Sequence, residues 1–167
     1  MTGVRVVPAR AAAGRILGTG LVVAVLDFFY VLVRRVWLEH ALTVEQLAQS
    51  IATGVLGRAA FDGGARTALL GLVLHLTIAC GWTLIFFVVT ARVPVLRSLV
   101  ATMRGRVLAG LVWGPIVWLL MDFVVLPLSL ARPTPTSSPT FYINLLQHAL
   151  MIGLPMALLL GGERHEL

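Results

Sequence analysis

The chain has 167 residues, of which 59% are apolar and only 12% are charged. A soluble domain carries about 25% charged residues, so this composition cannot cover a water-facing surface and excludes an ordinary soluble globular protein. The length is that of one domain, which we take to be residues 1–167. We therefore expect a single integral membrane domain whose apolar side chains face lipid.

The formal net charge is +6, and all 13 basic residues are arginines. Strong basicity can indicate that a protein binds nucleic acid. These arginines, however, are scattered at the ends of apolar segments and form no patch. Arginines in that position are typical of loops that flank membrane spans. We therefore expect the lipid bilayer, and no nucleic acid, as the partner, and we keep a homo-oligomer open.

Four segments are long and apolar enough to cross a bilayer, which takes about 20 residues in a helix. They are residues 16–33, 67–89, 107–130 and 141–160. Open strands do not survive in hydrocarbon, because their backbone groups would be left unpaired, so each span must be helical. The sequence predicts an all-α fold, a four-transmembrane-helix bundle.

The connection between the first two spans carries a helix signal of its own. Thr43 and Gln46 have the spacing of a capping box, which opens a helix. The apolar residues that follow share one face at helical spacing, with Gln49 off that face. They are Leu47, Ile51, Val55 and Leu56. We predict a short amphipathic helix at the membrane surface or over the mouth of the bundle, and an ordinary loop helix is the alternative.

The arginines also predict the orientation of the spans. Placing both termini and the loop between the second and third spans on one side collects eight arginines, against five on the other. Basic residues favour the cytoplasmic side, so we predict that both termini are cytoplasmic. The pair Arg34-Arg35 lies on the opposite side in this arrangement and counts against it.

The first and second halves of the chain resemble each other. In each half a span with a Gly-x-x-x-Gly pair and an Asp-Phe step precedes a span with a histidine. Asp27 and His75 would correspond to Asp122 and His148. We predict a two-fold internal repeat about an axis along the membrane normal. Small residues let helices approach closely, so the paired glycines are candidate helix-packing residues. They are Gly14, Gly18, Gly110 and Gly114.

The ionisable residues inside the spans are the candidate functional site. Each costs roughly 2.5–3.5 kcal/mol at the centre of a membrane helix, so each needs a reason to be there. At about 1.5 Å per residue they fall at similar depth in the outer half of the bilayer. They are Asp27, His75, Asp122 and His148, with Asn144 one turn from the last. We predict that they converge on one buried polar cluster.

Three interpretations of this cluster compete. It could be a structural network of interhelical hydrogen bonds. It could be the site of a small transporter or of a proton or ion relay, which is the usual use of buried Asp and His in membranes. It could hold a metal or a haem, although no metal-ligand spacing supports that and the cofactor stays unknown. Motifs for an enzyme, such as Gly-x-Ser-x-Gly or a Walker loop, do not occur in the sequence.

Several stretches resemble a group of small, uncharacterised bacterial inner-membrane proteins. They are Gln49–Gly57, Ala60-Phe61-x-Gly63-Gly64, Leu69–His75, Leu108–Leu111, Asp122–Leu128 and His148. The second half is more distantly similar to the YagU-type membrane proteins. The resemblance covers about residues 14–160 and implies a multi-pass protein of the bacterial inner (plasma) membrane. It implies no activity, so it does not choose among the three interpretations.

Overall fold

The structure is a computed structural model that describes residues 9–161, and over this range it contains helices and no strands. Four of the helical segments are long and apolar enough to span a membrane, which confirms the predicted all-α bundle. These spans are Arg10–Leu38, Gly64–Arg92, Met103–Val125 and Pro139–Leu160. Large apolar side chains cover their outer faces, as on Leu69 and Leu146. This is the architecture of a multi-pass membrane protein in contact with lipid.

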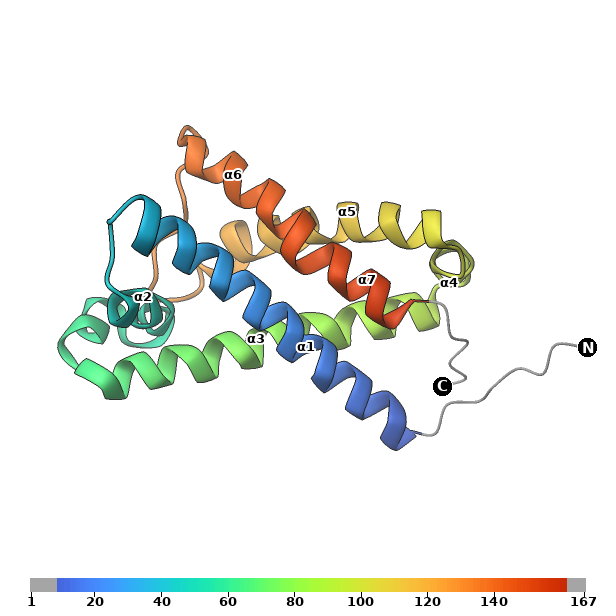
Figure 1. Ribbon diagram of the computed structural model, residues 1–167, viewed down its shortest axis with the longest axis horizontal. Helices are drawn as coiled ribbons and strands as arrows, with labels where there is room; N and C mark the ends of the chain where they lie inside the picture. Colours follow the sequence, from blue (N-terminus) through green and yellow to red (C-terminus); the bar gives the residue numbers. More distant parts are fainter. Residues whose placement is uncertain (1–8, 162–167) are drawn as a thin grey trace, which may run out of the picture.

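Helices α1 and α3 form one pair, and α5 forms a second pair with the last span (Figure 1). The short helices α2 and α4 lie at opposite ends of the bundle. The α-helices are α1 (Ala9–Leu32), α2 (Val44–Leu56), α3 (Gly64–Arg92), α4 (Pro94–Val100), α5 (Met103–Leu120), α6 (Pro139–His148) and α7 (Leu154–Leu160). They are joined or extended by η1 (Val33–Leu38), η2 (Gly57–Asp62), η3 (Met121–Val125) and η4 (Ala149–Gly153).

An apolar core closes the α4 end of the bundle. The backbones of α3 and α5 stay apart, and aromatic side chains fill the space between them there. Phe86 lies edge-on to Trp113 with 5.4 Å between ring centroids, and Trp82 meets the same ring at 6.5 Å. The buried cluster around them consists of Val23, Phe86, Phe87, Val100, Val117, Ile152, Met156, Ala157 and Leu160.

Backbone contact at glycine brings α5 against the last span. A Cβ at Gly110 would stand 2.7 Å from the carbonyl oxygen of Gly153, and one at Gly114 would overlap the carbonyl of His148. Only glycine fits at such a distance, because any side chain would push the helices apart. The close approach of α1 to α3 occurs at Gly20, which faces Cys80, rather than at the candidate residues Gly14 and Gly18. Around those two, the space that a Cβ would enter is open.

Two wide helical turns precede prolines, one at the end of the third span and one inside the fourth. The amide of Leu126 donates to the carbonyl of Met121, five residues back, just before Pro127. The amide of Leu154 donates to Ala149 in the same way just before Pro155. Proline has no N–H and crowds the preceding turn, so the helix widens in front of it. The third span therefore ends at Val125 rather than at the predicted residue 130.

Helix α2 begins as predicted. The Thr43 hydroxyl accepts from the Gln46 amide at 3.1 Å, and the Gln46 side chain accepts from the Thr43 amide at 2.9 Å. These reciprocal bonds form the capping box and confirm the predicted start of the helix.

The buried side of α2 includes Leu47 of the predicted apolar face, which is 4% exposed, but it differs from the prediction at two other residues. Val55 is 56% exposed, whereas Gln49 is only 2% exposed. The helix turns its small residues toward α3, so that the carbonyl of Ala48 lies where a Cβ of Gly71 would be. Gln49 is buried because its amide donates to the carbonyl of Gly64 at 3.1 Å. Close backbone packing and the hydrogen bonds of the Gln49 side chain therefore outweigh the burial of larger apolar side chains.

The glycine contact predicts a position-dependent loss of stability. Gly114→Ala should lower the free energy of unfolding in detergent by about 1–3 kcal/mol, because the new methyl group has backbone atoms in its place. Gly18→Ala is the matched control, and it should leave thermal unfolding unchanged or slightly raise the midpoint. Equal stability of the two variants would contradict the packing described here.

Candidate functional site

A cavity of about 740 Å³ lies inside the bundle, between α1, α2, α3, α5 and the last span. Aromatic and aliphatic side chains form most of its wall. The polar residues that line it are Asp27, Ser50, Thr53, Arg58, His75, Ser129, Arg132 and His148. The apolar core at the α4 end forms its floor, because Val23, Val117, Ile152 and Met156 belong to both.

Asp27 is held between two neighbouring helices. The side-chain amide of Gln147, on α6, donates to Asp27 Oδ1, and His75 Nε2, on α3, lies 3.7 Å from Asp27 Oδ2. The same His75 nitrogen is 3.0 Å from the carbonyl of Ala24. A carbonyl only accepts, so this nitrogen carries the proton and donates it. The carboxylate thus ties the first span to the second and the fourth.

His148 enters the cavity from α6. Its Nδ1 lies 2.9 Å from the carbonyl of Asn144 and donates to it. The ring stacks at a tilt on Trp118, with 4.8 Å between centroids, and is close enough to Asp27 and His75 to interact electrostatically with both. Within residues 9–161, the second ring nitrogen of His75 and that of His148 have no hydrogen-bond partner.

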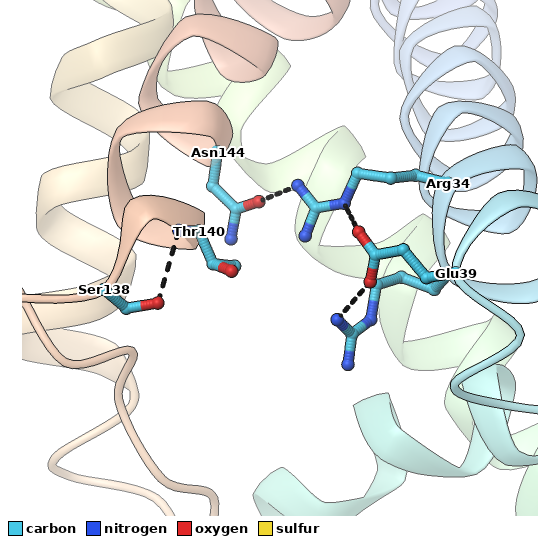
Figure 2. Close-up of polar contacts among 6 residues, drawn as sticks. Arg34, Glu39, Ser138, Thr140 and Asn144 are labelled. Atoms are coloured by element: carbon cyan, nitrogen blue, oxygen red, sulfur yellow. Dashed lines mark hydrogen bonds and ion pairs between the residues drawn. The ribbon is translucent and has the colours of Figure 1, made fainter.

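Asn144 joins a different network at the α2 end of the bundle (Figure 2). Its side-chain oxygen accepts from Arg34 at 2.9 Å, and the Arg34 guanidinium lies 3.2 Å from Glu39. Glu39 also pairs with Arg35 at 2.6 Å. The two arginines that counted against the predicted orientation therefore have a local role, since they share one carboxylate and fasten η1 to α6.

Asp122 lies apart from the other three ionisable groups. It is 1% exposed, and its Oδ1 accepts from the backbone amide of Thr134 at 2.8 Å. Its Oδ2 is buried and has no hydrogen-bond partner in the part of the chain described. The side chain does not line the cavity. Its contact is with the loop that follows η3, which it fastens to the end of the third span.

The structure thus brings Asp27, His75 and His148 to one cavity and places the side chains of Asn144 and Asp122 elsewhere. The polar contacts of the two halves differ, and the internal repeat stays a prediction. Among the residues described, 9–161, no group of three or more His, Cys, Asp or Glu side chains is arranged to hold a metal ion. The geometry of these residues therefore lends the metal-ion interpretation no support.

Two contributors to the site were missed by sequence analysis. Gln147 stands next to His148, and its 4% exposure comes from its bond to Asp27. The sequence feature that could have indicated Gln147 is a second amide side chain in a span that already contains Asn144. Trp118 packs on His148, but an aromatic residue in a membrane span carries no signal of its own. No family model, curated protein or solved structure matches the chain.

The bond between Asp27 and Gln147 predicts energetic coupling between the two residues. In a double-mutant cycle, Asp27→Ala and Gln147→Ala should couple by about 0.5–3 kcal/mol in unfolding, because each substitution strands the other's buried polar group. Asp27→Ala with Asp122→Ala is the control, and the effects of that pair should add, since Asp122 bonds to Thr134 instead. Additive effects in the first pair and coupling in the second would favour the cluster expected from sequence alone.

Proposed function

We propose that the protein is a small carrier of the bacterial inner membrane that binds its cargo in the central cavity, beside Asp27, His75 and His148. The cavity volume of about 740 Å³ falls within the range of small-molecule sites, which is roughly 300–1,000 Å³. Such sites combine a mainly apolar wall with a few placed polar groups, and this wall has the same make-up.

The observation that carries the proposal is the state of the two histidines. Each uses one ring nitrogen to donate to a backbone carbonyl, and each leaves the other nitrogen without a partner among the described residues, on a ring that lines the cavity. A neutral imidazole held in this way offers an acceptor, and a protonated one offers a donor. A cluster with only a structural role would use these nitrogens within the protein, since unmet polar groups are costly in a membrane.

The closed floor of the cavity fits one state of a carrier. Carriers expose a site near the bilayer midplane to one side at a time. Here the aromatic and aliphatic core blocks the α4 end, while Arg58, Phe61 and Arg132 line the cavity at the α2 end. If both termini are cytoplasmic, as we propose, this conformation opens outward.

A thiol-labelling experiment tests the carrier proposal. In a Cys80→Ala background, Ile152→Cys places a thiol on the cavity wall near its floor, and Val73→Cys places one on the outer face of α3. The cavity thiol should react with an impermeant reagent from the outside of cells and also in inside-out vesicles. The Val73→Cys thiol should react in neither, because it faces lipid. Labelling of Ile152→Cys from one side only would contradict a carrier and indicate a protein that only binds its ligand. No labelling from either side would overturn the proposal.

The proposed orientation has its own test. With Cys80 replaced, a cysteine at Arg97 should be shielded from an impermeant reagent in intact cells, because positive loops stay in the cytoplasm. A cysteine at Ser137, in the exposed loop between the third and fourth spans, should react. The reverse labelling pattern would place the termini outside and make the present conformation inward-open.

A further inference from the structure

We infer that the cargo is an anionic amphiphile whose acidic head group binds between Arg58 and Arg132 while its apolar body lies in the cavity. This inference rests on the proposed function, since it names the substrate class of the same cavity. The shared chemistry is one phosphate or carboxylate on a chain-like or ring-like apolar body. Membrane lipids and soluble amphiphiles both have it.

The rim of the cavity is built so that the two arginines belong to one site. The amide of Leu130, in the turn after η3, donates to the carbonyl of Gly54 in α2 at 3.0 Å. Gly57 has φ +57°, which turns the chain from α2 into η2 and brings it against Leu130. Arg58 follows this turn directly and Arg132 lies two residues past Leu130, so one hydrogen-bonded junction carries both side chains to the same cavity.

Both guanidinium groups are available to an anion. Within residues 9–161, neither Arg58 nor Arg132 has an ion pair or a side-chain hydrogen bond, whereas Arg34 and Arg35 are paired with Glu39. Arginine binds phosphate and carboxylate through two parallel N–H donors, which makes it the strongest side chain for this purpose. Other exposed arginines, such as Arg92 and Arg97, do not line the cavity.

Charge fixes the orientation of the ligand. Asp27 lies on the cavity wall, so an acid placed beside it would meet a carboxylate of the same sign. The rim offers two positive charges instead. The head group therefore belongs at the rim, and the apolar body lies inward, against side chains such as Trp82, Trp118 and Ile152.

Part of the cavity wall consists of residues that are also exposed on the outside of the bundle. The backbones of α3 and α5 stay apart, and the residues of the cavity wall beside this gap are partly exposed. Ile78 is 36% exposed and Val125 is 38% exposed. An amphiphile in the bilayer could therefore enter sideways with its head at the arginine level, as lipid head groups lie at the membrane surface.

Quenching of tryptophan fluorescence tests this inference. The protein is placed in nanodiscs of phosphatidylcholine after Trp37→Phe and Trp113→Phe, which leaves Trp82 and Trp118 on the cavity wall. The probe is 11-bromoundecyl phosphate, whose bromine quenches a nearby indole. We expect saturable quenching, weakened about tenfold or more by Arg58→Gln with Arg132→Gln, because charge-assisted hydrogen bonds are lost. The matched control, Arg92→Gln with Arg97→Gln, should leave it unchanged.

Two further probes separate the sources of the signal. 11-Bromoundecanol has the chain without the acid and should quench only at about tenfold or higher concentration. Equal quenching by the alcohol would overturn the role of the arginines. Displacement of the probe by inorganic phosphate at comparable concentration would show a site for the free anion and overturn the amphiphile.

A variant that fills the cavity separates the two proposals from each other. Ile78→Phe enlarges a wall residue and should abolish quenching, while Val73→Phe, on the outer face of the same helix, should not. If Ile152→Cys is labelled from both sides but the bromophosphate does not quench, the carrier proposal stands and the ligand class is wrong. If quenching by the probe survives Ile78→Phe unchanged, the ligand lies outside the cavity and the inference fails.

Discussion

Backbone contact between α5 and the last span is the constraint on which the rest of the site depends. Gly114 lies against the carbonyl of His148, and Gly110 lies against Gly153, so the two helices have one register and one distance. In that register His148 packs on Trp118 and faces the cavity, while its neighbour Gln147 points to Asp27 on α1. A side chain at either glycine would move both polar contacts at once, because consecutive residues of one helix carry them.

The polar residues can have a structural and a functional role at once, because different atoms serve each role. Asp27 is satisfied by Gln147 and lies near His75, and these contacts join three spans. The same contacts leave one nitrogen of His75 directed away from the bonded carbonyl, on a ring that lines the cavity. A network of this kind can hold helices together and still present a titratable group to a ligand, since an imidazole has two independent nitrogens.

Features that depend on the order of residues along the chain were predicted from the sequence, and features that depend on contacts between distant residues were not. Span number and the start of α2 follow from apolar length and from the spacing of Thr43 and Gln46. The buried face of α2 does not, because Gln49 is buried by a carbonyl fifteen residues away. Similar depth suggested that Asp122 would join Asp27, but depth says nothing about which side of a helix a residue occupies. Asp122 bonds instead to a loop that folds back after Pro127.

The order of charges along the cavity restricts what a carrier could do with an acidic ligand. The arginines lie at the rim, and the histidines and Asp27 line the same cavity away from it. An anion that left the rim would lose two positive partners and approach a carboxylate, which is unfavourable between mainly apolar walls. In the proposed carrier, a positive charge on an imidazole at that depth would stand in for the two arginines that the anion leaves. The proposal therefore assigns the rim arginines and the histidines to successive positions of one ligand.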